Sequence, residues 1–154
     1  MKHTGVPVGV IGAVLLTLGL AAQQKPDFSG RWVQLEPSEG AGTEERIIHD
    51  LNANTLTFDH DSTEGGHSHK RVYKLDGSEA RNTLPSHGSE IVILSRAMWT
   101  GNQIYITEVA TYPDGRRMDT KLILSIDSGG QLITEGTQTI DGKTTTIRGV
   151  GKKR

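Results

Sequence analysis

The densest group of metal-ligating side chains in this sequence lies around one polar turn, where His60 and Asp61 precede His67 and His69. His67 and His69 are two residues apart, so on a strand both point to the same side, and His60 lies across the turn from them. Imidazole nitrogens together with a carboxylate can bind zinc or copper. The same residues also fit a solvated hairpin tip whose histidines only titrate. We favour this second interpretation and keep the metal site as the alternative.

Other catalytic patterns are absent from the sequence. His49 and His87 stand apart from other candidate ligands, and the acidic residues are scattered without a pair placed for acid–base chemistry. Ser86-His87 is not part of a nucleophile motif, and no glycine-rich phosphate loop is present. The sequence therefore gives no warrant for an enzyme, and it implies no cofactor.

The N-terminal segment has the pattern of a secretory signal. Lys2 begins a short polar start, residues 6–20 are mostly apolar, and small residues follow at Ala21 and Ala22. A charged start, an apolar stretch and a small-residue cleavage site are typical of a signal peptide. We therefore expect a signal peptide at 1–22 with cleavage near Ala21-Ala22, a linker at 23–26, a domain at 27–154, and a secreted or periplasmic location.

Composition limits the partners of the mature chain. The net charge is -1, and 23% of the residues are charged. This balance gives no electrostatic reason to bind nucleic acid or an anionic membrane. Cysteine is absent, so disulfides and thiol chemistry are excluded. After the signal there is no second apolar run long enough for a membrane span, and no signal for an oligomeric state.

The candidate ligands must be positioned by β-strands. Short runs rich in β-branched residues alternate with turn signals, and helix formers occur in no long block after residue 22. The sequence predicts strands at 32–35, 45–50, 55–60 and 67–75, then a long loop at 76–89. From 90 to 148 it predicts five strands, separated by turns at 100–102, 113–115, 127–130 and 141–142. Consecutive strands with short turns pair with their neighbours, and closing the sheet removes its edges.

The predicted fold is therefore all-β: an antiparallel up-and-down meander of about 8–10 strands, closed or nearly closed into a barrel. A barrel of this size either encloses a ligand or is filled by its own side chains. Alternation along the strands predicts six candidate residues for a ligand-binding lumen: Trp99, Tyr105, Ile106, Tyr112, Met118 and Leu122. Of the two tyrosines, the candidate is whichever side chain faces inward.

Gly30-Arg31-Trp32 at the head of this meander resembles the start of the lipocalin and fatty-acid-binding barrels. In that family the tryptophan packs at the closed barrel end under a basic residue of the last strand, and the resemblance assigns that part to Arg148. With Asp27-Phe28-Ser29 before this motif and Trp99-Thr100-Gly101 later, the chain resembles small secreted bacterial proteins of the lipocalin-like (calycin-type) group.

The resemblance implies an extracytoplasmic protein that binds a small apolar or amphipathic ligand or a protein partner. Two alternatives remain. One is a metal-binding module or metalloenzyme at His60, His67 and His69. The other is a structural or inhibitory surface domain whose barrel is solid.

Overall fold

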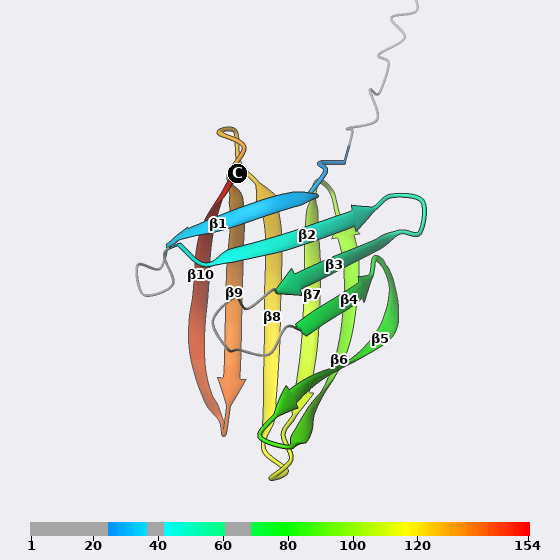
Figure 1. Cartoon of the computed structure of the whole chain (residues 1–154), viewed down its shortest axis with the longest axis vertical. Coiled ribbons are helices and arrows are strands. Elements are labelled where there is room, and N and C mark those ends of the chain that lie inside the picture. The colour runs from blue at the N-terminus through cyan, green and yellow to red at the C-terminus, as the bar shows by residue number, and fades with distance from the viewer. Residues whose placement is uncertain (1–24, 37–41, 61–68) are drawn as a thin grey trace, which may run out of the picture.

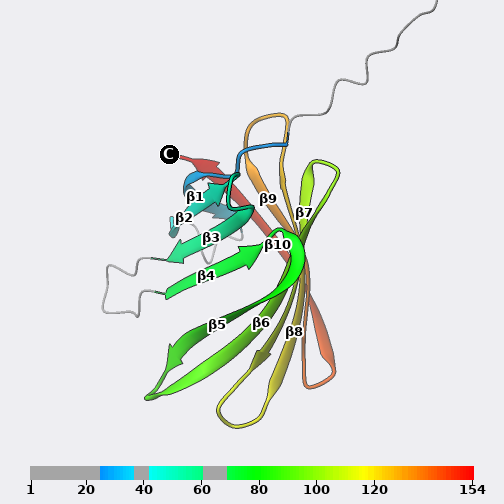
Figure 2. The same cartoon turned by 90° about the vertical axis from the view of Figure 1, so that its right-hand side faces the viewer.

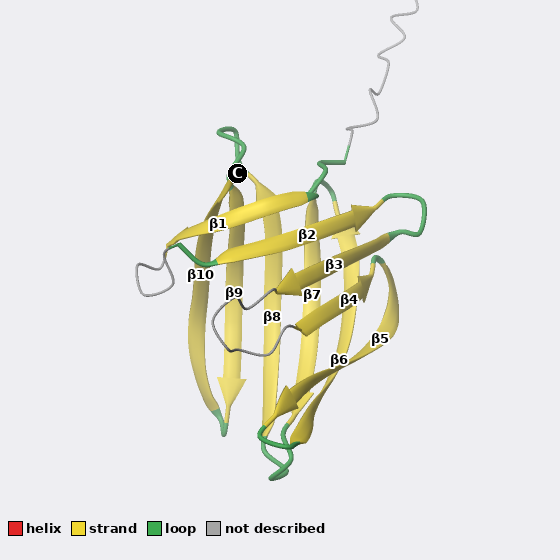
Figure 3. Ribbon diagram, viewed as in Figure 1, coloured by secondary structure: helices red, strands yellow, loops and turns green. Residues whose placement is uncertain are grey.

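A computed structural model describes residues 25–36, 42–60 and 69–154. All the regular structure in these ranges is β-strand, joined by turns and loops (Figure 3). The strands form a single antiparallel sheet in the order β4-β3-β2-β1-β10-β9-β8-β7-β6-β5. Their bounds are β1 Gly30–Glu36, β2 Glu44–Asp50, β3 Thr55–His60, β4 His69–Lys74, β5 Asp76–Ser86, β6 Ser89–Thr100, β7 Gln103–Thr111, β8 Arg117–Ile126, β9 Leu132–Ile140 and β10 Lys143–Lys153.

The sheet curls because its first strand pairs with its last. In β1, Trp32 lies opposite Lys153 of β10 and, on the other side, opposite Glu45 of β2. The short strands β1 to β4 consequently cross in front of the long strands β6 to β10 (Figures 1 and 2). The result is a nearly closed antiparallel barrel, as the sequence predicts.

The meander from 90 to 148 is confirmed, including its strongest turn. Asp141 and Gly142 both have positive φ, 50° and 77°, and Ile140 lies opposite Lys143 across them. Positive φ at both central residues is the requirement of a type I′ hairpin, whose twist matches that of the flanking strands. The alternation is also confirmed, because Ile104 and Ile106 are buried on the inner face of β7.

The predicted loop at 76–89 is wrong, since most of it is β5. Few of its residues are apolar, which made it resemble a loop, yet Ala80 and Asn82 alternate inward and are buried. Pro85 is tolerated because β5 is an outer strand that pairs only with β6, and proline removes no ladder hydrogen bond on the free side. The place of this segment in the folded sheet, more than its composition, therefore determines that it forms a strand.

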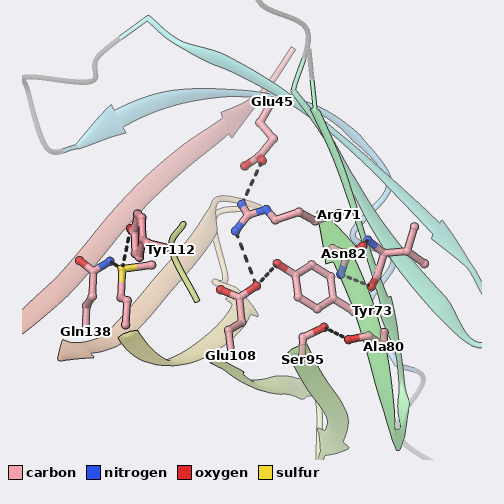
Figure 4. A network of polar contacts seen from close by, with 11 residues as sticks. Glu45, Arg71, Tyr73, Ala80, Asn82, Ser95, Glu108, Tyr112 and Gln138 are labelled. Atoms are coloured by element: carbon pink, nitrogen blue, oxygen red, sulfur yellow. Dashed lines mark hydrogen bonds and ion pairs between the residues drawn. The ribbon is translucent and has the colours of Figure 1, made fainter. Parts of the chain in front are cut away.

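The barrel has one unsealed seam, between β4 and β5, which are consecutive in the chain but are not ladder neighbours. The side chain of Asn82 spans this seam. Its Oδ1 accepts a hydrogen bond from the Val72 N–H at 2.8 Å, and its Nδ2 donates to the Val72 carbonyl at 3.0 Å (Figure 4). One amide side chain thus satisfies the two backbone groups that a neighbouring strand would otherwise pair.

One end of the barrel is closed by an apolar core and by the chain before β1. Phe28 is fully buried, and its carbonyl accepts a hydrogen bond from the Trp32 indole N–H at 2.9 Å. Phe28 and Trp99 pack with ring centroids 6.0 Å apart, and His49 lies against both rings. The core cluster comprises Phe28, Trp32, Ile47, Leu56, Phe58, Tyr73, Leu75, Ala97, Ile104, Ile106, Leu124 and Leu132. Within the described ranges there is no helix that could cross a membrane.

Candidate ligand-binding site

A pocket of about 390 Å³ lies between the short front strands β1 to β4 and the strands β9 and β10. Its polar lining includes Glu45, Arg71 and the two histidines His60 and His69. Its apolar lining comes from Trp32, Leu132, Ile147 and Val150. A pocket with an apolar wall and a few convergent polar groups is the usual form of a small-molecule site.

Strand alternation places these side chains on the inner face. Arg71 lies opposite Phe58 in the β3–β4 ladder, and Phe58 is a core residue. Glu45 lies opposite Trp32 in the β1–β2 ladder, and Trp32 is buried as well. Because paired residues in a sheet point to the same face, Arg71 and Glu45 are directed into the barrel by the partners beside them.

Arg71 joins two carboxylates at the base of the pocket (Figure 4). Its Nη1 lies 3.6 Å from Oε1 of Glu108, and its Nη2 lies 4.0 Å from Oε1 of Glu45. The guanidinium also lies over the Phe58 ring, 5.8 Å from its centroid. Its Nε is buried without a hydrogen-bond partner among the described residues. The guanidinium therefore compensates the charges of Glu108 and Glu45, and its Nε–H can still donate a hydrogen bond.

Glu108 is the buried anchor of this network. Its side chain is 5% exposed, and its Oε1 accepts a hydrogen bond from the Tyr73 hydroxyl at 2.7 Å. Burial raises the pKa of Tyr73 well above its usual range, and the neighbouring Glu108 raises it further while Arg71 opposes the rise. The phenol therefore keeps its proton and donates to the carboxylate. This bond fixes Glu108 behind Arg71.

Glu45 is the second acid, and its environment is different. Its side chain is 33% exposed and lies at the pocket rather than behind it. Burial raises the pKa of this carboxyl, whereas its electrostatic interactions with Arg71 and His60 lower it by less. Desolvation thus outweighs attraction to the arginine, because the ion pair is long and Arg71 is shared with Glu108.

His60 and His69 lie directly opposite each other at the open end of the β3–β4 ladder. Their rings are stacked, with centroids 4.9 Å apart and an interplanar angle of 29°. His60 thus lies across the hairpin from His69, in the position that their places in the sequence allow. His67 lies outside the described residues. Among those that are described, no group of three or more histidine, cysteine or acidic side chains is arranged to hold a metal ion.

The six predicted lumen residues lie apart from this pocket. Ile106 is buried in the core, and Trp99 and Leu122 pack against that core. Met118 is on the inner face nearer the β9–β10 hairpin, where its sulfur contacts the Tyr112 hydroxyl and the Gln138 side-chain amide (Figure 4). Tyr105 lies between buried Ile104 and Ile106 and opposite exposed Met98 and Ile123, so it is on the outer face.

The basic residue beside Trp32 is Lys153, not Arg148. The Lys153 ammonium lies 5.6 Å from the centroid of the indole ring. Gly30 makes room for this side chain, because a Cβ there would come within 2.5 Å of Lys153 Cε. Arg148 is 62% exposed and forms an ion pair with Glu36 at 3.0 Å. The assignment of Arg148 is therefore wrong, because the β1–β10 register brings the end of β10 to Trp32 instead.

The charged network of the pocket was missed at the sequence level, although part of it left a signal. Glu108 follows Ile104 and Ile106 at two-residue spacing and precedes Ala110, so alternation alone places a carboxylate on the core face of a strand. An acid at such a position requires a partner. Arg71 and Glu45 gave no such signal, because their partners lie on distant strands.

Comparison with known proteins does not assign this chain to a family. No protein-family model matches the chain, and no curated protein matches it either. Among solved structures the chain is similar to secretory abundant heat soluble protein 4 from Ramazzottius varieornatus, with a TM-score of 0.49 and 15% sequence identity. That match covers 82% of this chain and 94% of the other.

Proposed function

We propose that this barrel is an exported, lipocalin-like protein that binds a small amphipathic molecule in the pocket between β1–β4 and β9–β10. The observation that carries the proposal is the arrangement of Arg71 and Glu45 at the base of a pocket whose wall is apolar. Both side chains are partly buried. A guanidinium and a carboxyl in such a place are costly to desolvate and add little to stability by themselves. Their placement is useful when a ligand completes their hydrogen bonds.

The apolar wall provides the second half of the site. Leu132 is buried, and Trp32 is 3% exposed beneath the pocket. Gly149 and Gly151 of β10 line the pocket beside these two residues, so the wall carries no side chain at either glycine. A pocket of about 390 Å³ falls in the range of about 300–1,000 Å³ that holds small ligands. An alkyl or ring portion packs here while the head group reaches Arg71.

Two features support the lipocalin-like and exported parts of the proposal. Trp32 follows Gly30 on the first strand and is covered by a basic residue of the last strand, Lys153. The N-terminal pattern of Lys2, an apolar run and Ala21-Ala22 is that of a secretory signal, and it lies outside the described residues. The solid-barrel alternative fits only the core at one end, because the pocket occupies the space beside it.

The test is to fill the pocket with a side chain. Thr134 lines the pocket from β9, so Thr134→Trp places an indole in the ligand volume. Thr146 on β10 is exposed and adjoins inward-facing Ile147, so Thr146→Trp makes the same change on the outer face. An environment-sensitive dye such as Nile red is titrated against the folded wild type and both variants.

We expect saturable dye binding by wild type and Thr146→Trp, and loss of at least about tenfold in affinity for Thr134→Trp, which is about 1.4 kcal/mol. Circular dichroism confirms that each variant keeps its strands. Absence of saturable binding by the wild type, or equal binding by the two folded variants, refutes a ligand site in this pocket.

A further inference from the structure

The charges at the base of the pocket indicate which head group it accepts. In the described part of the chain, one guanidinium faces two carboxylates there: Arg71 lies between Glu108 and Glu45. Glu108 is held from behind by the Tyr73 hydroxyl, so it stays beside Arg71 whether or not a ligand is bound. The positive charge of Arg71 is therefore already shared before any ligand enters.

The ion pair between Arg71 and Glu45 leaves both groups able to bind something else. Their closest atoms are 4.0 Å apart, which is beyond hydrogen-bond distance. Neither side chain is deeply inaccessible, since Arg71 is 25% exposed and Glu45 is 33% exposed. A guanidinium donor and a carboxylate acceptor thus stand side by side at the pocket, each with unused hydrogen-bonding capacity.

A charged head group would satisfy only one of these two residues. A carboxylate or phosphate accepts from Arg71 but places negative charge against Glu45. An ammonium donates to Glu45 but places positive charge against Arg71. Like charges brought together in a partly desolvated site are strongly unfavourable. Burial already raises the pKa of Glu45 despite the neighbouring arginine, so desolvation of this carboxyl outweighs its attraction to Arg71.

Resting on the proposed binding function, we propose that the pocket selects amphipathic molecules whose head group is uncharged and both donates and accepts hydrogen bonds. A hydroxyl or a primary amide has this chemistry, because it donates to Glu45 and accepts from Arg71 at the same time. The gap between the two side chains is then bridged by one neutral group, and no charge is left unpaired.

The other charged and titratable groups around the pocket leave this conclusion unchanged. Glu44 accepts hydrogen bonds from Arg31 and Arg154, both at 2.9 Å. Arg148 is largely exposed and pairs with Glu36. His60 and His69 also line the pocket, so every titration is run at one fixed pH near 8.

The experiment compares three ligands with the same ten-carbon chain: 1-decanol, decanoate and decylammonium. Each displaces the dye from wild type, from Glu45→Gln and from Glu90→Gln, all checked for folding by circular dichroism. Glu90 is exposed on β6 and lies outside the pocket lining, so Glu90→Gln controls for the loss of one negative charge.

For wild type we expect 1-decanol to bind at least about tenfold more tightly than either charged ligand. Glu45→Gln raises decanoate affinity about tenfold and changes decanol affinity by less than about threefold, whereas Glu90→Gln changes neither. Decanoate binding to wild type as tightly as decanol, or equal effects of the two substitutions, overturns the head-group inference alone. Failure of all three ligands to bind overturns the proposed function together with it.

Discussion

Replacing Asn82 with alanine tests how the barrel is held closed. Asn82 is 8% exposed and makes both of its hydrogen bonds to Val72 across the seam, at 2.8 and 3.0 Å. Each bond contributes about 0.5–1.5 kcal/mol net. Because Val72 is only half-buried, water replaces part of what is lost. We expect the free energy of unfolding to fall by about 2 kcal/mol, the middle of the range for two such bonds.

The assay has a global and a local readout. Urea unfolding followed by circular dichroism gives the free energy of unfolding. Native-state hydrogen exchange gives the protection of the Val72 N–H, which we expect to fall more than that of Ile106 in the intact β7 ladder. Thr83→Ala is the matched control, because Thr83 is the next residue on β5 and its side chain is exposed.

A second substitution separates the hydrogen bonds from packing. Asn82→Asp keeps an acceptor for the Val72 N–H but turns the donor into an oxygen that faces the Val72 carbonyl. We expect it to be at least as destabilising as Asn82→Ala at neutral pH. A loss below about 0.5 kcal/mol in Asn82→Ala, or unchanged protection at Val72, would refute the view that this amide seals the seam.

Three further perturbations test other parts of the structure. Tyr73→Phe removes a buried hydrogen bond to a carboxylate, so urea unfolding should show a loss of about 1.5–3 kcal/mol, while Tyr105→Phe on the outer face should change stability little. Burial lowers the pKa of His49, against a smaller opposing effect of a nearby aspartate, so the folded state resists its protonation. The stabilising contribution of neutral His49 is fully present above the unfolded-state pKa of about 6.5, and it is lost as the pH falls through the lower folded-state pKa. His49→Gln should therefore reduce the fall in the free energy of unfolding that urea titrations show from pH 8 to 5. Lys153→Met should reduce stability by about 0.5–1 kcal/mol and alter tryptophan emission, whereas Arg148→Met should leave the emission unchanged.

Local pattern was enough to predict every strand except β5. Residues 55–60 are predicted as a strand and form β3 with those bounds, because Leu56 and Phe58 alternate with polar residues. Residues 76–86 lack that contrast, and they are held as a strand by β6 and by the bridge of Asn82 to Val72. Such a strand depends on contacts between segments that sequence spacing does not reveal.

The same distinction applies to the site. The stacking of His60 and His69 follows from a hairpin and is predictable. The position of Lys153 over Trp32 depends on the register between the first and last strands, whereas the resemblance behind Arg148 specifies only a basic residue of the last strand. The meeting of Arg71 with Glu108 depends on how strongly the sheet curls, which is a property of the whole chain.

In the proposed complex, one ligand contacts both Arg71 and the apolar wall of the same pocket. Nuclear magnetic resonance with ¹⁵N labelling tests it most directly, by following the Arg71 Nε–H and the Trp32 indole N–H during titration with 1-decanol. We predict that both resonances shift saturably with one dissociation constant, while the indole of Trp99, which packs against the core outside the pocket, shifts much less. Shifts confined to Trp99, or no saturable shift of Arg71, would show that no ligand binds at Arg71 in this pocket.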